Sequence, residues 1–424
     1  MLMACQRGSI KITVSDTARL YPPLWGGPKR IWNLYSNLGD MFDITYVGTD
    51  PGDDKRQYIN RKIKGNFREV IQPISDMYYL FRDFEVKIMR KLTFDIFTYL
   101  CMWFDKGFKK ELNRYDADIL IASHPWSSPC FKIKEGQIFI YDAHNCEYLL
   151  MKEILKGKWY RWVISFFVRR IERAACKKAK IIIVTSEKDK ESFVKLYKIS
   201  EDKILILPNG TCIGDLPSRD RREEITSRLK RKGRDIILFV GAYYNPNIEA
   251  ARFIVEAIAE DLKDIDIVIV GTVGDYFKNN NIPENVRLAG RVADSELYEW
   301  LTVADIAINP MFIGSGINIK MLDYFSFGLP VIATPVGARG IEGIDSRDFV
   351  VCDKEGFIDM IRQLLGNESL RCQMGKNSRR LAEELYDWRK ISAKFSCIIE
   401  GLVENNGISS IGSDRRNLCW RNQS

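Results

Sequence analysis

The segment Asn309–Thr334 reads NPMFIGSGINIKMLDYFSFGLPVIAT. It follows a short apolar run, Ile306–Ile308, of the kind that forms a buried strand. The glycines in its middle would let the backbone approach a ligand closely, and the residues after them predict a helix over Ile317–Phe325. A Gly-Leu-Pro sequence then leads into another apolar run, Val331–Ala333. A strand, a glycine loop, a helix and a second strand in this order predict a parallel α/β sheet.

The same alternation of short apolar runs and longer amphipathic stretches extends along the chain. A first series of expected strands comprises Ile10–Val14, Ile44–Val47, Ile119–Ala122, Ile138–Tyr141, Ile181–Val184 and Ile204–Leu207. A second series comprises Ile236–Val240, Ile265–Val270, Val286–Leu288, Ile306–Ile308, Val331–Ala333 and Phe349–Val351. This alternation favours parallel sheets with helices on their faces. Because 424 residues are too many for one ordinary core, we expect two such α/β domains.

The two series suggest where the domains divide. We expect one Rossmann-like domain over residues 1–211, a second over 212–386, a C-terminal helix over 387–405 that packs back on the first domain, and a disordered tail over 406–424. The polar, basic stretch Thr211–Asp235 is interpreted as a linker with a short solvated helix. Ligands of doubly wound folds bind beyond the carboxyl ends of the strands, so the site is expected there, between the domains.

The glycine loop of the opening segment predicts a diphosphate site. A helix N-terminus attracts anions through its unpaired amides and its dipole. Lys320 could neutralise phosphate there, and Asp323, one turn further on the same face, could accept two hydrogen bonds from a ribose diol. The alternative is an ordinary turn followed by a surface ion pair. The residues expected around the diphosphate are Gly314, Ser315, Gly316, Ile317 and Asn318.

Taken together, the glycine loop, the lysine, the acid and the following strand resemble the donor-binding region of retaining GT-B enzymes, specifically glycosyltransferase family 4. Ser315 stands where many members have the first glutamate of an E-x7-E pair, as in the Gly-Ser-Gly subset, and Asp323 stands at the second. The resemblance extends from Ile10 to about Glu404. It implies two Rossmann-like domains facing each other across a cleft. It also implies retaining transfer from a nucleotide-sugar to a glycan or lipid-linked saccharide, with no metal and no cofactor.

The resemblance also assigns roles to other turns of the second domain. It places Gly241 near the phosphates, and Arg291 and Val292 beside the nucleotide base. A surface charge is an equally good interpretation of Arg291. Asn247 is expected to cap the helix that follows Gly241.

In the first domain, the resemblance places Gly26 and Gly27 opposite the donor phosphates, before a helix expected over Lys29–Leu38. Glycines at a helix start also favour an anion by themselves, and Arg30 in the first turn could aid phosphate binding. His144, within the D-x-H-N-x-E sequence that begins at Asp142, would face the donor sugar in a catalytic role. Lys320 and Asp323 complete the expected catalytic set. His124 follows another strand and would line the acceptor cleft or support its loop.

Composition narrows the class of protein further. Only two histidines and no C-x-x-C pair are present, which argues against a zinc site. Ten scattered cysteines suit a reducing compartment, and we expect a cytoplasmic protein. The formal charge of +8 is dispersed, which disfavours nucleic acid as a partner. The aromatic and basic stretches Met77–Lys110 and Lys156–Lys180 would suit peripheral contact with the inner face of a membrane, or else core-facing aromatics with solvated lysines.

Two rival functions share this fold. A nucleotide-sugar epimerase would act on the donor alone, but it would need several carboxylates and histidines around the sugar ring. A non-catalytic nucleotide-sugar-binding protein would keep the site without turnover.

Overall fold

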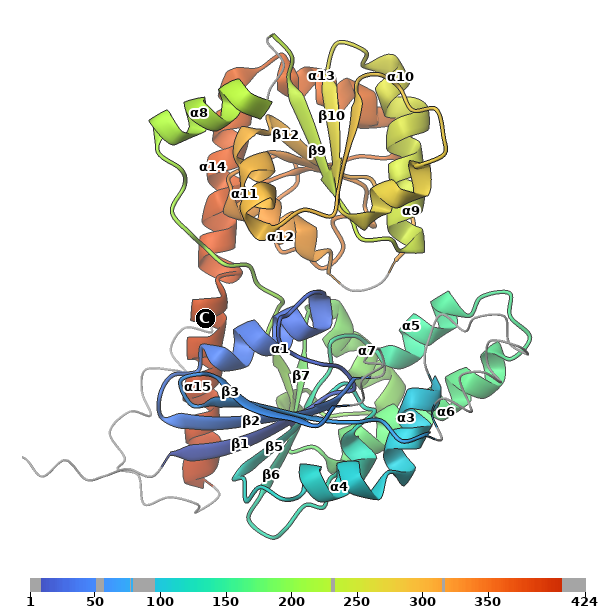
Figure 1. Ribbon diagram of the computed structural model, residues 1–424, viewed down its shortest axis with the longest axis vertical. Helices are drawn as coiled ribbons and strands as arrows, with labels where there is room; N and C mark the ends of the chain where they lie inside the picture. Colours follow the sequence, from blue (N-terminus) through green and yellow to red (C-terminus); the bar gives the residue numbers. More distant parts are fainter. Residues whose placement is uncertain are drawn as a thin grey trace, which may run out of the picture. The chain divides into compact units, whose positions relative to one another are not determined.

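The computed structural model describes residues 9–50, 57–76, 78, 96–229, 233–314 and 317–405. The chain forms two compact units, shown in Figure 1. The N-terminal unit runs to Pro208 and resumes at Ile391, and the C-terminal unit comprises Asn209–Lys390. The expected linker Thr211–Asp235 therefore belongs to the C-terminal unit. The tail expected over 406–424 lies outside the described residues. So do residues 77 and 79–95 of the aromatic and basic stretch Met77–Lys110.

The N-terminal unit is built on an eight-stranded sheet with the order β3-β4-β2-β1-β5-β6-β7-β8. Its strands are β1 (Ile10–Ser15), β2 (Phe42–Thr49), β3 (Ile59–Lys64), β4 (Phe67–Gln72), β5 (Ile119–Ser123), β6 (Ile138–Asp142), β7 (Ile181–Val184) and β8 (Ile204–Ile206). All neighbours pair in parallel except β3 and β4. The six predicted strands are present, and they are apolar because helices cover both faces of the sheet.

The hairpin β3–β4 was not predicted from the sequence. β3 alternates between half-buried and exposed residues and carries Arg61, Lys62 and Lys64 at the margin of the sheet. A charged, half-exposed edge strand lacks the continuous apolar run that marks the buried strands.

Among the residues that the structure describes, the α-helices of this unit are α1 (Gly26–Ser36), α3 (Ile96–Phe104), α4 (Lys106–Leu112), α5 (Glu147–Ile154), α6 (Arg161–Lys178), α7 (Glu187–Tyr197) and most of α15 (Trp388–Asn405). The last helix of the chain contacts the first one directly. The Ser392 hydroxyl donates to the Leu34 carbonyl at 2.8 Å, and the rings of Tyr35 and Phe395 lie 6.1 Å apart.

The C-terminal unit holds a six-stranded parallel sheet with the order β11-β10-β9-β12-β13-β14. Its strands are β9 (Ile236–Val240), β10 (Asp266–Val270), β11 (Val286–Gly290), β12 (Ile306–Asn309), β13 (Val331–Ala333) and β14 (Val350–Val351). Its helices are α8 (Arg219–Leu229), α9 (Asn245–Phe253), a π-helical turn (Ile254–Ile258), α10 (Ala259–Asp261), α11 (Asp294–Val303), α12 (Ile319–Ser326), α13 (Phe357–Leu365) and α14 (Glu368–Leu385).

This sheet separates two hydrophobic cores. Successive residues of β9 point to opposite faces: Ile237 and Phe239 belong to one core, and Ile236 and Leu238 to the other. Burial on both sides explains why the predicted strands are uninterrupted apolar runs. Two Rossmann-like α/β units confirm the predicted GT-B architecture.

The C-terminal helix expected over 387–405 is present as α15, and a short break separates it from α14. α14 ends before Tyr386 and α15 starts at Trp388. At the break, the Thr211 amide donates to the Tyr386 carbonyl, and the Trp388 amide donates to the Thr211 carbonyl. These backbone hydrogen bonds to a distant residue replace those that a continuous helix would form. In the part of the chain that the structure describes, no helix is long and apolar enough to cross a membrane.

Candidate functional site

Polar residues gather at the carboxyl ends of three neighbouring strands in the N-terminal unit. Asp16 follows β1, His124 follows β5, and Asp142 ends β6, two residues before His144. The chain proceeds from β1 to β2 on one side and returns to β5 on the other, so the sheet order reverses between β1 and β5. Doubly wound folds bind their ligands at such a reversal, beyond the carboxyl ends of the strands.

His124 is the centre of this group. Its Nδ1 lies 3.2 Å from Asp16 Oδ1, and its Nε2 lies 3.8 Å from Glu147 Oε1. Its ring centre is 4.1 Å from that of His144, with the rings tilted by 53°. A Cβ atom on Gly27 would lie 3.9 Å from each of the two rings. We call Asp16, His124, His144 and Glu147 the histidine cluster.

The two histidines differ in charge. Burial by itself lowers the pKa of His124, but the carboxylates of Asp16, Glu147 and Asp142 raise it to about 9. For His144, burial and then the positive charge of His124 lower the pKa to about 4. At neutral pH the cluster therefore pairs an imidazolium with a neutral imidazole. Burial also raises the pKa of Glu147 to about 7, so this carboxyl group exchanges a proton near neutrality.

Arg30 has a different position from the one expected for a phosphate ligand. Its side chain is 1% exposed, and its guanidinium contacts Asp142 Oδ1 at 2.9 Å and the carbonyls of Leu207 and Pro208 at 3.1 and 3.2 Å. Tyr35 also donates to Asp142, at 2.9 Å. Although burial alone would raise it, the neighbouring Arg30 holds the pKa of Asp142 well below its usual range. Arg30 thus acts as an internal countercharge beneath the cluster.

The helix that carries Arg30 also starts earlier than predicted. α1 begins at Gly26 rather than Lys29, so Gly26 and Gly27 form its first turn instead of a preceding loop. Trp25 precedes the helix without a side-chain cap. The prediction missed this start because a glycine pair followed by proline is a stronger signal for a turn than for a helix.

The C-terminal unit has a comparable site around Lys320. This lysine lies in the first turn of α12, after β12, and its Nζ donates to Asn247 Oδ1 at 2.8 Å. Asn247 lies in the first turn of α9, after β9. Because the sheet order reverses between β9 and β12, this hydrogen bond spans the second reversal point of the molecule.

The ammonium group of Lys320 is in unusual surroundings. It lies 4.3 Å from the centre of the Phe239 ring and 3.9 Å from Met311 Sδ. Among the described residues, no carboxylate pairs with it, so the ion pair with Asp323 that the sequence left open is not formed. Part of the side chain remains exposed, but burial of the amino group lowers the pKa of Lys320 to about 7. An anion that reaches this buried amino group would stabilise its charged, ammonium form.

Asp323 projects from the same helix toward a different neighbour. Its Oδ1 accepts a hydrogen bond from Thr211 Oγ1 at 2.9 Å. A ribose placed here would share the carboxylate with Thr211. The helix itself begins at Ile319 with Asn318 as its N-cap, so Ile317 and Asn318 precede it rather than forming its first turn. Asn318 uses its amide group to donate to the Gly337 carbonyl at 3.0 Å.

The glycine loop before α12 is only partly described. Ser315 and Gly316 lie outside the described residues, and Gly314 has a φ of 142°, which favours glycine. The guanidinium of Arg339 donates to the Gly314 carbonyl and so anchors the start of this loop. Sequence reasoning missed Arg339, because a lone arginine far along the chain gives no sign of this contact.

Other predicted donor residues lie at the same edge of the sheet. Gly241 follows β9, where an added Cβ would approach Val273 Cγ1 at 3.2 Å, so the glycine also serves close packing. Arg291 and Val292 follow β11; Arg291 is exposed, and Val292 packs against one of the two cores. Asn247 is not the helix cap that was expected: Tyr244 occupies that position.

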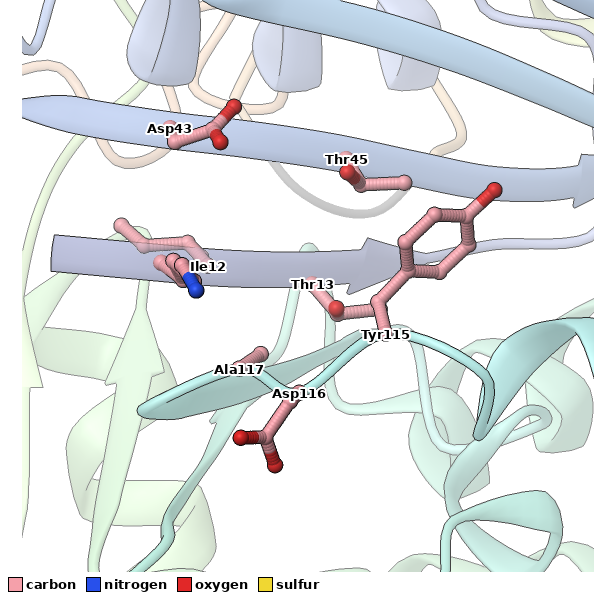
Figure 2. Close-up of a pocket in the computed structure, with 8 residues that line it drawn as sticks. Ile12, Thr13, Asp43, Thr45, Tyr115, Asp116 and Ala117 are labelled. Atoms are coloured by element: carbon pink, nitrogen blue, oxygen red, sulfur yellow. The ribbon is translucent and has the colours of Figure 1, made fainter. Parts of the chain in front are cut away.

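Two cavities lie elsewhere in the units. Figure 2 shows one of about 210 Å³ that includes Thr13 of β1, Thr45 of β2 and Tyr115, which precedes β5. A second, of about 420 Å³, lies beside Asp305 and Pro330, which precede β12 and β13. Both are at the amino ends of strands, away from the histidine cluster and Lys320.

The fold and these residues can be compared with known proteins. The family model described as Glycosyltransferase Family 4 matches residues 26–213, and the model described as Glycosyl transferases group 1 matches residues 234–367. An uncharacterised glycosyltransferase of Methanocaldococcus jannaschii is 22% identical over 276 residues, covering 62% of this chain and 68% of the relative.

Solved structures give the same result for the fold. A sucrose-phosphate synthase from Thermosynechococcus elongatus has a TM-score of 0.72 at 16% identity and covers 93% of this chain and 100% of its own. Anabaena HepE in complex with UDP-glucose has a TM-score of 0.64 at 10% identity, with coverages of 92% and 100%.

The two Rossmann-like units thus have the GT-B fold, and both family models that match them are glycosyltransferase models. The chain belongs to the glycosyltransferases of group 1 and family 4, and its enzymatic class is that of a transferase. Its first family match covers His124, His144 and Glu147 of the histidine cluster but begins after Asp16, and its second covers Lys320 and its contacts.

Proposed function

We propose that this chain transfers a sugar from a nucleoside-diphosphate sugar to a glycan or lipid-linked saccharide, with retention of the anomeric configuration and without a metal ion. The observation that carries the proposal is the Lys320–Asn247 contact across the reversal between β9 and β12. HepE, which shares the fold, was solved with UDP-glucose, which supports a nucleotide-sugar as the donor class.

Lys320 would bind the diphosphate and stabilise it as it leaves. When the bond to the sugar breaks, negative charge accumulates on the departing phosphate, and a preorganised cation beside it lowers the barrier. The start of α12 adds its dipole to this field. Asp323 would orient the ribose, and Arg291 or the backbone near Gly241 would contact other parts of the nucleotide.

The histidine cluster would act on the sugar. His144 is neutral at physiological pH, so it can share a hydrogen bond with a sugar hydroxyl without a cost in charge. The imidazolium of His124 would stabilise negative charge near the acceptor, held by Asp16. In the retaining reaction proposed here, the acceptor's proton would pass to the departing phosphate, so the cluster would orient the groups rather than supply a nucleophile.

The test begins with a turnover screen against UDP-, GDP- and ADP-sugars, with simple saccharides and lipid-linked saccharides as acceptors. Proton NMR of the product gives its anomeric configuration, and an assay with excess EDTA tests the need for a metal. Lys320→Ala should reduce turnover by at least about a hundredfold. Lys263→Ala is the matched control, since Lys263 is exposed at the amino end of β10.

The alternative functions give different results in the same screen. An epimerase would convert the donor sugar without any acceptor, and a non-catalytic binder would shift the melting temperature with a nucleotide-sugar but release no nucleotide. Inversion of the anomeric carbon, or full activity of Lys320→Ala, would overturn the proposed mechanism.

A further inference from the structure

The exposed face of α6 is apolar, which is unusual for a surface helix. Trp162, Val163, Phe166 and Phe167 follow the i, i+3, i+4 spacing that places side chains on one face. They are between 56% and 79% exposed, and Trp159 just before the helix is 81% exposed. We call these five residues the aromatic stripe. Figure 1 shows α6 beside α5 in the N-terminal unit.

The stripe is not needed for the core of the unit. The opposite face of α6 supplies the buried residues Ile164, Val168, Ala175 and Cys176, which join the main hydrophobic core. The sequence had left core-facing aromatics as one interpretation of this segment. That interpretation holds for Tyr160, which is buried, and is wrong for the four aromatic residues of the stripe.

Positive charge surrounds the stripe. From Leu155 to Ile171 the chain carries five basic residues and no acidic one. Glu172, the next acid, is buried and accepts hydrogen bonds from the amides of Glu147 and Tyr148 and the hydroxyl of Tyr197, so it does not offset this charge at the surface. The basic residues are Lys156, Lys158, Arg161, Arg169 and Arg170. The Arg170 guanidinium lies 5.6 Å from the centre of the Phe166 ring, so cations border the aromatic groups directly.

We propose that the aromatic stripe and its basic border dock this enzyme on an anionic lipid surface. Exposed Trp and Phe on one helix face, with Lys and Arg beside them, match the boundary between acyl chains and anionic headgroups. The aromatic rings enter the interface, and the cations remain with the phosphates. Docking through α6 is independent of the nucleotide-sugar site, and it would bring the enzyme to acceptors held in a membrane.

Charge favours lipid over a second copy of the chain. A symmetric dimer through this face would place the same five basic residues opposite each other, without acidic partners from Leu155 to Ile171. An anionic bilayer supplies the complementary charge and an apolar layer together. Such docking should weaken as salt screens the attraction.

The experiment is sedimentation of the full chain with vesicles. Phosphatidylcholine vesicles are compared with vesicles that also contain phosphatidylglycerol, at low salt and at about 0.5 M NaCl. We expect at least about tenfold stronger partitioning onto the anionic vesicles, most of it lost at high salt. Trp162→Ser/Phe166→Ser should weaken this binding at least about tenfold, because two interfacial anchors are removed.

Charge-reversal variants separate docking from non-specific attraction. Arg169→Glu/Arg170→Glu should abolish binding to the anionic vesicles. Lys188→Glu/Lys195→Glu changes the net charge equally, from exposed positions on α7, and should retain most of the binding. All of these substitutions are at exposed positions, and circular dichroism melting confirms that each variant is folded.

Three results would overturn the proposal. They are equal partitioning onto both kinds of vesicle, equal losses for the α6 and α7 charge variants, and a dimer in sedimentation velocity that Trp162→Ser/Phe166→Ser dissociates. Turnover of a water-soluble acceptor should be unchanged in the α6 variants. A failure of the docking proposal can therefore be told from a failure of the transferase proposal, because only the second would abolish turnover of a water-soluble acceptor.

Discussion

Binding of a nucleotide-sugar should draw a proton onto Lys320. In the unliganded protein, burial lowers the pKa of this lysine to about 7, so its amino group is about half neutral at pH 7 and about nine-tenths neutral at pH 8. A diphosphate beside the amino group would favour the ammonium form and raise the pKa again. Binding should then take up ~0.5 proton at pH 7, ~0.9 proton at pH 8 and only ~0.1 proton at pH 6.

The same linkage fixes how affinity depends on pH. Below pH 7 the lysine is already charged and the Kd should be nearly constant. Above pH 7 each binding event must first protonate it, so the Kd should increase and be about tenfold higher at pH 8 than at pH 6. The best-bound of the UDP-, GDP- and ADP-sugars is the suitable probe, because its diphosphate has no proton to lose in this range.

Isothermal titration calorimetry in buffers of different ionisation enthalpy measures the proton uptake directly. Lys320→Met should abolish both the uptake and the pH dependence of the Kd, whereas Lys263→Met should keep both. If uptake is absent at pH 8, or persists in Lys320→Met, then the lysine either is charged in the free protein or does not contact the diphosphate, and the reasoning fails.

Three further predictions concern stability, each measured by urea unfolding followed by circular dichroism. Arg30→Met leaves Asp142 buried without its countercharge and should lower the free energy of unfolding by about 3–5 kcal/mol; a loss below about 1 kcal/mol would show that the pair is dispensable. Gly375→Ala places a methyl group 2.2 Å from the Gly328 carbonyl oxygen, so we expect a loss of about 1–3 kcal/mol, and an unchanged midpoint would contradict the close approach of α12 and α14. The folded-state pKa of His124 is raised from 6.5 to about 9, so its stabilisation is complete below pH 6.5 and disappears as the pH increases through 9. The excess stability of the wild type over His124→Gln should fall by about 3 kcal/mol over this window, because Lys320, which also titrates there, contributes alike to both proteins; equal pH profiles would mean that the histidine is not protonated.

The sequence located most of the strands because burial on both faces leaves a continuous apolar run. β9 illustrates this, since its residues alternate between two cores and all must be apolar. The strand ends then located most candidate residues, including His124, His144 and Lys320, because doubly wound folds place ligands there. The hairpin β3–β4 was not predicted, because its half-exposed edge strand β3 has no continuous apolar run.

Which of these residues meet was decided only by the tertiary structure. Asp16 pairs with His124 across 108 positions, and Asn247 with Lys320 across 73. Each contact exists because the sheet places the first strand of its unit beside a strand from much later in the chain, β1 beside β5 and β9 beside β12.

The charge states of the site residues were likewise decided by the tertiary structure rather than by the sequence. The residue types show that Lys320 and both histidines can carry a proton, but not at which pH. Burial and the distances to other charges determine that His124 is charged while His144 is neutral, and that Lys320 titrates near neutrality. The pKa of each group depends on the residues that pack around it. Strand order and packing bring those residues together from distant parts of the chain, and no local pattern in the sequence connects them.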